Sequence, residues 1–425
     1  MNDEQRKILD MVEQEIITSE DAARLLKALD DSCESTSTAQ PVRQAPPVQT
    51  SPEQNAPAQE KSGLGKLARD IRSAALETAK LALKETEKQL KRSFGDLTGT
   101  FPENGEFPEM TAEQMDEDFQ AARENPKEYP PMEGELTELR IKWLRGNVEV
   151  RLTDGGQIRV TEYSRQPVTE DQAQTRLTWE DGELWITWVT QPEKMLQPHC
   201  YAKHLLVEIP RSAAAGLEEV EIKNVSGTLR VDDLKAEDMK LSLVSGKMLL
   251  SRIGGEDLEV SNVDGLISLQ GVEAEDLNVS GVNAAVTLRD VKSEDLNVSG
   301  VNGIVTVEEF HAEDATFSTV SGTLTAKGSC DELSLSSVSG EAKAELSRLP
   351  EEADANTISG MVALGLPDRE EGFTVSFQMQ NEGSFDCEFP LTGELGGKSG
   401  EGTYGDGEAE LNLHTVCGMM NLYRV

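Results

Sequence analysis

A period of nineteen residues constrains this 425-residue chain more than any other feature of it. The segments that begin at Leu258, Leu277 and Leu296 read LEVSNVDGLISLQGVEAED, LNVSGVNAAVTLRDVKSED and LNVSGVNGIVTVEEFHAED. Units of the same pattern precede and follow them. A unit of this length carries too few apolar side chains to close a core alone, so neighbouring units must stack and share one.

The residue types within each unit predict strands and exclude helices. Nineteen residues accommodate two strands of about five residues and two turns, and the apolar residues alternate with a period of two. Val-Ser-Gly and Val-Asn-Gly are poor helix formers. We therefore predict a mainly β chain, a parallel β-solenoid (β-helix-like) of about 19-residue repeats, whose Leu and Val side chains fill one continuous core.

Two positions recur at one corner of each unit. An aliphatic residue, which we take as an anchor of the core, stands at Val225, Val244, Val263, Val282, Val301, Val320, Val338 and Ile358. Two residues later stand Gly227, Gly246, Gly265, Ala284, Gly303, Gly322, Gly340 and Gly360. A recurring glycine fits a corner where successive backbones come close or where φ is positive.

Stacked units also place identical side chains about 4.8 Å apart. One predicted column is a ladder of hydroxyls, formed by Ser242, Ser261, Ser280, Ser299, Ser318 and Ser336. The other consists of the pairs Glu237-Asp238, Glu256-Asp257, Glu275-Asp276, Glu294-Asp295 and Glu313-Asp314. Such carboxylates repel one another unless water or cations separate them. The pairs lack the Asp/Gly loop spacing of calcium-binding repeats, which favours a solvated acidic edge over a calcium site.

Composition divides the chain into seven segments. The predicted organisation is a helical hairpin over 1–31, a Pro-rich linker over 32–62, a basic amphipathic helix over 63–95, an acidic linker over 96–131, a β-rich entry or cap region over 132–216, the repeats over 217–362 and a C-terminal β region over 363–425. A hairpin of this size cannot form an independent core, so it must pack against itself in an oligomer, against a partner or against another part of the chain.

The segment 63–95 is a basic island in an acidic chain. Its apolar residues recur at helical spacing, at Leu64, Leu67, Ile71, Ala74, Ala75, Thr78, Leu81 and Ala82. Its cations are Lys66, Arg69, Arg72, Lys80, Lys84, Lys88, Lys91 and Arg92, against the acids Asp70, Glu77, Glu85 and Glu87. These cations are the candidate contact to an anionic membrane or a protein partner. The alternative is that the segment packs on the protein itself, with its basic face toward the acidic bulk.

The charge balance of the whole chain excludes one class of partner. There are 78 acidic residues against 40 basic ones, a net charge of −38. Such a field repels phosphates, so we predict no nucleic-acid binding. The chain opens without a signal peptide and has no apolar run long enough to span a membrane. Its five cysteines have no motif spacing, which is typical of reduced thiols. We expect a cytoplasmic protein, with a peripheral position at the inner membrane face as an option.

Motifs that would carry chemistry are weak. Gly397-Lys398-Ser399 resembles the end of a phosphate-binding loop, but Thr392 stands where that motif needs its first glycine. His199, Cys200 and His204 lie within six residues, yet three ligands without a fourth are usually incidental. We therefore expect no enzyme, and no catalytic, cofactor-binding or metal-binding residue.

The repeat units carry a family resemblance. The pattern Leu-x-Val-x-x-Val-x-Gly-x-Val-x-Leu, the strand Val207–Pro210 and the segment Leu411–Gly418 resemble the DUF4097 family, described as adhesins, over about residues 134 to 425. The opening hairpin is similar to the SHOCT-like segment at the start of Gram-positive members of the YvlB and LiaX type. The resemblance implies a β-solenoid fold and a role in cell-envelope stress, and it offers no catalytic residue.

The function that follows is a non-enzymatic interaction or scaffold protein in envelope-stress sensing or signalling. It would act through the helical N-terminal module and the solenoid surface on protein partners. One alternative is an exported, adhesin-like surface protein that binds a ligand along the solenoid. Another is a solenoid enzyme that cleaves polysaccharides, which would need a groove of acids and basic residues that the repeats do not supply.

Overall fold

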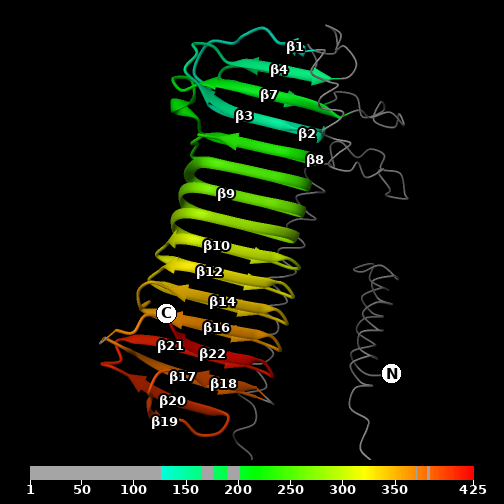
Figure 1. The fold of residues 1–425 in the computed structure, drawn as a ribbon. Helices are drawn as coiled ribbons and strands as arrows, with labels where there is room; N and C mark the ends of the chain where they lie inside the picture. The colour runs from blue at the N-terminus through cyan, green and yellow to red at the C-terminus, as the bar shows by residue number, and fades with distance from the viewer. Residues whose placement is uncertain (1–125, 165–175, 189–201, 370, 381–382) are drawn as a thin grey trace, which may run out of the picture. The chain divides into compact units, whose positions relative to one another are not determined.

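The computed structural model describes residues 126–425 except 165–175, 189–201, 370 and 381–382 (Figure 1). The chain divides into two units, Met1–Gln59 and Glu60–Val425, and every described residue belongs to the second. The predicted hairpin 1–31, the linker 32–62, the basic segment 63–95 with its eight cations, and most of the linker 96–131 lie outside the described residues, as do His199 and Cys200.

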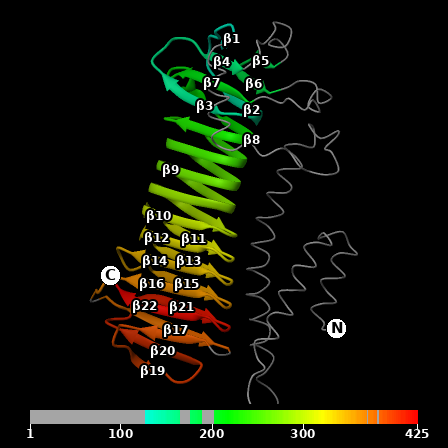
Figure 2. The same ribbon diagram turned by 45° about the vertical axis from the view of Figure 1, so that its right-hand side comes forward.

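The described chain is a parallel β-solenoid, as the repeat predicts. Each turn contributes one strand to each of two stacks, which Figure 2 shows side by side and which we call sheet A and sheet B. Two long elements, β8 (Glu219–Asp232) and β9 (Asp238–Gly300), pass through both sheets, so all strands belong to one open sheet. A single short 3-10 helix, η2 (Ala214–Gly216), precedes β8 in the described part.

The order of strands in sheet A follows from their backbone hydrogen-bond pairings. From the N-terminal end it runs β5 (Leu177–Glu180), β6 (Glu183–Thr187), β2 (Glu138–Arg145), β8, β9, β11 (Asp314–Thr319), β13 (Glu332–Ser337), β15 (Glu352–Thr357), β21 (Ala409–Thr415), β17 (Phe373–Met379), β20 (Ser399–Tyr404) and β19 (Thr392–Glu394).

Sheet B is built in the same way. Its order is β1 (Pro126–Glu128), β4 (Arg159–Ser164), β7 (Lys203–Pro210), β3 (Val148–Thr153), β8, β9, β10 (Ile304–His311), β12 (Thr323–Ser329), β14 (Glu341–Leu346), β16 (Met361–Leu366), β22 (Met419–Arg424) and β18 (Ser384–Cys387).

At both ends of the solenoid the order of turns in space differs from their order in the sequence. The turn β2–β3 lies between β8 and the later turn β6–β7. Likewise the turn β21–β22 lies between β15–β16 and the earlier turn β17–β18. Antiparallel strands then cover outer edges, with β5 on β6 and β20 on β17. The register of the repeat therefore continues beyond residues 217–362, and several terminal edges are covered against pairing with other chains.

The core lies between the two sheets and changes in composition along the axis. In the middle turns it consists mostly of Leu, Val, Met and Ala side chains that alternate inward along each strand, such as Leu241 and Leu250. Apart from Phe310 and Phe317, whose rings pack together in the middle turns, the buried aromatic side chains lie toward the ends. Trp143 is buried near the N-terminal end, and at the C-terminal end Phe373 lies edge-on to Phe389, with ring centroids 5.0 Å apart. The chain therefore needs few aromatic residues, because small side chains fill most layers of the core and bulky ones cover its two ends.

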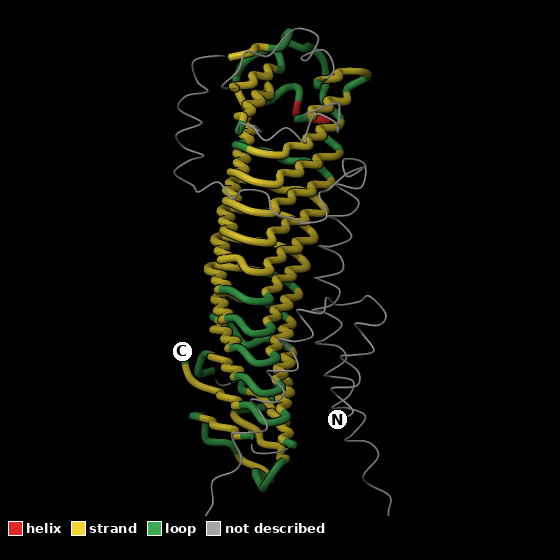
Figure 3. The backbone as a smooth tube through the Cα atoms, turned by 90° about the vertical axis from the view of Figure 1, so that its right-hand side faces the viewer, coloured by secondary structure: helices red, strands yellow, loops and turns green. Residues whose placement is uncertain are grey.

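The glycine corner confirms the expected close approach of successive backbones. A Cβ on Gly246 would stand 2.0 Å from the carbonyl oxygen of Gly227, and one on Gly322 would stand 2.3 Å from that of Gly303. The corner takes two forms, which Figure 3 shows as continuous strand in the upper turns and loop in the lower turns. Gly227, Gly246 and Gly265 have φ between 129° and 138°, whereas no positive φ occurs from Ala284 onward in this column.

The second form of the corner uses side chains as caps. The backbone N–H of Gly322 donates to Thr319 Oγ1 at 3.2 Å, and that of Gly418 donates to Thr415 Oγ1 at 2.7 Å. Such caps satisfy the backbone locally. Alanine is accommodated at 284, where the column leaves the positive-φ form.

One residue of each unit, the fourteenth when the units are counted from Leu258, has its own structural role at the opposite corner. A column of positive φ runs through Asp233, Arg252, Gly271, Asp290 and Glu309. The register between β10 and β12 shifts between Glu308 and Phe310, so Glu309 is the extra residue of a β-bulge. The next unit, from Val320 to Val338, is one residue shorter, and β12 pairs with β14 without a register shift. The period of nineteen therefore includes one bulge residue per turn.

Candidate interaction surface

The outward side of sheet A, which we call the A face, carries four columns of side chains. At the start of β9, one residue of each column follows the next, in the order Asp238, Lys240, Ser242 and Val244. Buried residues alternate with these outward residues. The strand pairings place equivalent residues in line, because Glu219 is opposite Asp238 and Asp295 is opposite Asp314. We name these the acidic, mixed, serine and aliphatic columns.

The acidic column is continuous along the described solenoid. From the N-terminal end it consists of Glu183, Glu138, Glu219, Asp238, Asp257, Asp276, Asp295, Asp314, Glu332, Glu352 and Glu410. The seven turns from Asp257 to Glu410 also carry Glu259 and Asp354 in the mixed column, and their A face holds no Lys or Arg. This stretch of the A face therefore presents carboxylates without an interleaved basic residue.

These carboxylates are largely unneutralised by the described part of the chain. Lys240 reaches Glu259 at 2.8 Å, but no described Lys or Arg forms an ion pair with Asp257, Asp276, Asp295, Asp314, Glu332, Glu352 or Glu410. The neighbouring charge of Asp314 is the largest cause that raises the pKa of Glu332 above its ordinary value. The column is thus a line of mutual repulsion that a cationic partner would relieve.

The serine column lines up along the turns as the sequence predicts, and one link of the expected hydroxyl ladder is present as a hydrogen bond. Ser261 Oγ donates to Ser242 Oγ at 3.1 Å, and Ser318 is opposite both Ser299 and Ser336. Ser261 is buried although it belongs to the outward side of its strand. Beside this column, the mixed column of the same turns holds small residues such as Asn278 and Thr316. Low relief of this kind lets a partner backbone approach closely.

The aliphatic column corrects the expectation that these residues anchor the core. Its members are half-buried and lie on the outward side, at Leu144, Val225, Val244, Val263, Val282, Val301, Val320, Val338, Ile358 and Val416. The inward position is the residue before, as at the buried Leu243. The strand alternation continues through the corner, which explains why the valine after an inward residue turns outward. The result is a strip of apolar surface beside the serine column.

Aromatic and basic groups gather at the N-terminal end of the A face, and His414 of β21 is a further ring among its outward positions. Trp185 is 42% exposed, and the Arg140 guanidinium lies over its ring, 4.9 Å from the centroid. Arg140 Nη2 also pairs with Glu219 at 3.0 Å. Charges at this end are therefore compensated, and the uncompensated stretch begins further along the solenoid.

The outward side of sheet B, the B face, has a different charge pattern. In the same seven turns its outward positions hold three acids and three bases, which are Glu308, Glu341, Glu345, Arg289, Lys327 and Lys343. Arg289 pairs with Glu308 at 2.9 Å, and Glu345 accepts from Lys327 at 2.6 Å and from Lys343 at 2.8 Å. Hydrogen bonds from Lys327, then Lys343, lower the pKa of Glu345 to about 2. The B face neutralises itself.

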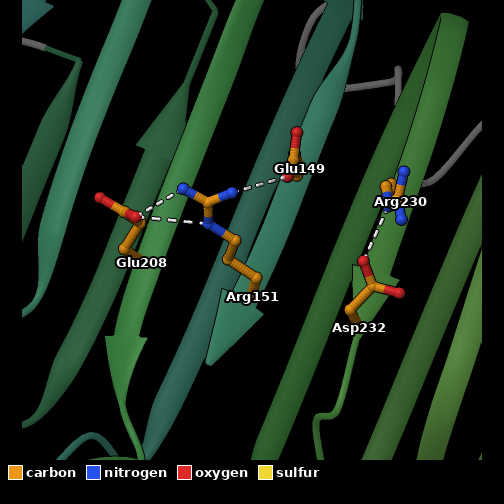
Figure 4. A network of polar contacts seen from close by, with 5 residues as sticks. All are labelled: Glu149, Arg151, Glu208, Arg230 and Asp232. Carbon is orange, nitrogen blue, oxygen red and sulfur yellow. Dashed lines mark hydrogen bonds and ion pairs between the residues drawn. The ribbon is translucent and has the colours of Figure 1, made fainter. Parts of the chain in front are cut away.

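The N-terminal part of the B face continues this pairing. Arg151 donates to Glu208 through Nη2 at 2.7 Å and through Nε at 3.3 Å, and it also reaches Glu149 at 3.4 Å. Arg230 Nε donates to Asp232 at 2.7 Å. Figure 4 shows both groups, with each guanidinium directed at a carboxylate.

A buried ion cluster holds the N-terminal end together. Glu162 is only 1% exposed, and its carboxylate accepts from Arg176 at 2.7 Å and from Tyr129 at 2.9 Å, with Lys203 Nζ 3.2 Å away. Burial raises the pKa of Tyr129. The cluster connects strands β1, β4 and β7, so we interpret it as structural.

The remaining candidate motifs show no assembled chemistry in the described part. His204 is buried with its ring beside Tyr163, at a centroid distance of 5.5 Å. Lys398 Nζ donates to the Gln380 carbonyl at 2.7 Å. Among the described residues, no group of three or more His, Cys, Asp or Glu side chains is placed to hold a metal ion. No described helix is long and apolar enough to cross a membrane.

Comparison with known families agrees with the fold. The Toastrack DUF4097 profile matches residues 136–279 and again 254–422. A SHOCT-like domain profile matches residues 3–32, which lie outside the described residues. No curated protein matches the chain in sequence.

Solved structures with some similarity come from three bacteria. A candidate adhesin from Bacteroides fragilis has 12% identity over 71% of this chain and 96% of that chain, with a TM-score of 0.31. A candidate cell adhesion protein from Clostridium sporogenes has 13% identity over 71% and 100%, with a TM-score of 0.18. A candidate lipid-binding protein from Parabacteroides distasonis has 13% identity over 70% and 96%, with a TM-score of 0.29.

Proposed function

The chain belongs to the Toastrack DUF4097 family, and we propose that it is a non-enzymatic interaction protein that acts in cell-envelope stress signalling. The observation that carries the proposal is the A face, where seven turns present acidic, small polar and aliphatic columns and no described Lys or Arg forms an ion pair with the acidic column from Asp257 to Glu410. Such a surface suits a cationic, amphipathic protein partner, because charge would orient the partner and the aliphatic column would add apolar contact.

The envelope-stress role is supported by the combination of segments. The SHOCT-like segment at 3–32 and the DUF4097 solenoid occur in one chain, which is the combination that the resemblance associates with envelope stress. The proposal places the protein in the cytoplasm or at the inner face of the membrane. The three described cysteines are free thiols, as a reducing compartment requires.

The test compares two charge-matched variants of the full chain in its native host. Asp257→Lys with Asp295→Lys alters the acidic column, and Glu341→Lys with Asp386→Lys alters exposed positions of the B face by the same charge. We expect the first variant to change the output of an envelope-stress reporter several-fold after exposure to a cell-wall antibiotic, and the second to behave as the parent. Equal behaviour of both variants and the parent would contradict the proposal.

Two measurements address the alternative functions. Fractionation that finds the chain only at the outer surface would favour an exported adhesin. Turnover of a polysaccharide in a depolymerisation screen with the purified chain would favour a solenoid enzyme. The proposal expects neither result.

A further inference from the structure

We propose that residues 63–95 of this same chain dock along the A face. The inference concerns an intramolecular contact and so goes beyond the proposed function, because docking can fail while the A face still binds a partner. The segment itself lies outside the described residues, and the placement rests on charge, length and apolar pattern.

Charge is the first point of complementarity. The segment has eight cations against four acids, in a chain whose net charge is −38. The A face from Asp257 to Glu410 offers the reverse pattern, with nine carboxylates and no cation. The B face of the same turns carries cations as well as acids, and its Arg289, Lys327 and Lys343 pair with Glu308 and Glu345. Coulombic attraction therefore selects the A face over the B face.

Length is the second point. The 33 residues of 63–95 would extend about 50 Å as a helix. The stretch from Asp257 to Glu410 has seven members of the acidic column, and six spacings of about 4.8 Å give about 29 Å. A helix of residues 63–95 that runs along the solenoid axis would therefore be long enough to cover this whole stretch.

The apolar pattern is the third point. With 100° per residue, Leu64, Ile71 and Ala82 fall on one side of the predicted helix. Lys66, Lys84 and Lys88 fall beside one edge of that side together with Asp70 and Glu77, whereas Arg69, Lys80 and Lys91 fall on the opposite side. The A face has the same arrangement, with the aliphatic and serine columns at one edge and the acidic column at the other. Alanines on the helix and serines on the sheet are small, which allows close packing of a helix on a sheet. Long Lys side chains can span the remaining distance to the acids.

Hydrogen exchange of the full chain tests the docking. We expect amides of residues 63–95 to be protected at low salt, and Asp257→Lys with Asp295→Lys to raise their exchange rates at least about tenfold. The matched variant Glu341→Lys with Asp386→Lys should leave them unchanged. Raising the salt concentration should act like the A-face variant, because the contact includes solvent-exposed charge.

Three results would overturn the inference. The amides of 63–95 could exchange at the same rate in the parent and in the A-face variant, which would mean that no contact depends on the acidic column. Protection could rise with protein concentration, which would assign the contact to a second copy. Protection could also appear only when vesicles of anionic lipid are added, which would assign the segment to a membrane.

Discussion

The two faces of this solenoid are built from one repeat, and they differ in how they treat charge. On the B face each cation of the middle turns lies near a carboxylate of the same or the next turn, as Arg289 lies near Glu308. On the A face the repeat places an acid above an acid, as Asp295 lies beside Asp314. A stacked repeat multiplies whatever one unit carries, so a single acidic position becomes a charged line. The B face therefore contributes to stability, whereas the A face is left for interaction.

The largest expected change in the free energy of unfolding comes from a substitution at the glycine corner, which joins the two sheets. Gly246→Ala would place a Cβ 2.0 Å from the Gly227 carbonyl oxygen at a φ of 134°. We expect a loss of about 3 kcal/mol in the free energy of unfolding, from the strained conformation and the overpacking together. Ala284→Gly, at the same column but outside the positive-φ form, should cost no more than about 1 kcal/mol. Urea unfolding of both variants measures the difference, and equal stabilities would contradict this description of the corner.

A smaller effect is expected on the B face. Glu345→Gln removes the negative charge shared by Lys327 and Lys343 and replaces one acceptor oxygen with an amide donor, and we expect it to destabilise the protein by about 1 kcal/mol at pH 7. The pKa of Glu345 is lowered from 4.5 to about 2 in the folded state. Its stabilising contribution is therefore complete above 4.5 and is lost as pH falls toward 2.

The pH dependence of stability in the parent and in Glu345→Gln tests this contribution separately. The difference in stability between the parent and Glu345→Gln should shrink between pH 5 and pH 2 in denaturant titrations. A difference that stays constant over this range would show that the carboxylate charge does not stabilise the B face.

The smallest expected change in stability is on the A face, where removal of a charge should stabilise the protein and not destabilise it. Asp276→Asn removes one charge from a line of like charges, so we expect no loss of stability and a gain of up to about 0.5 kcal/mol. The same thermal or urea unfolding measurement applies. A clear destabilisation by Asp276→Asn would show that the acidic column is held by favourable contacts, and it would remove the contrast between the faces.

The sequence predicts the architecture well because the repeat reports stacking directly. The corner glycines and the alignment of the serine column follow from the period, and the structure confirms both. The outward position of the valines was not predicted, because a valine next to a glycine turn is compatible with a buried position and with an exposed one. The bulge column through Asp233 and Glu309 has no common residue type, because positive φ there is imposed by the register.

The candidate surface was predictable only in part. The Glu-Asp pairs were visible in the sequence as a column, but their continuation to Glu138 and Glu410 depends on turns that are inserted out of order at the two ends. Those insertions bring together strands far apart in the sequence, which no local pattern encodes. The self-neutralised B face also required the strand register, because Lys327 and Glu345 come from different turns.

Zero-length carbodiimide crosslinking of the full chain most directly tests whether the A face is the binding face. The reagent joins a lysine amine to a carboxylate in contact with it, and peptide mapping identifies both residues. We predict crosslinks from Lys66, Lys84 or Lys88 to the acidic column between Asp257 and Glu410, and their loss at high salt. Crosslinks from these lysines to acids of the B face instead, or to none of the solenoid, would contradict the assignment.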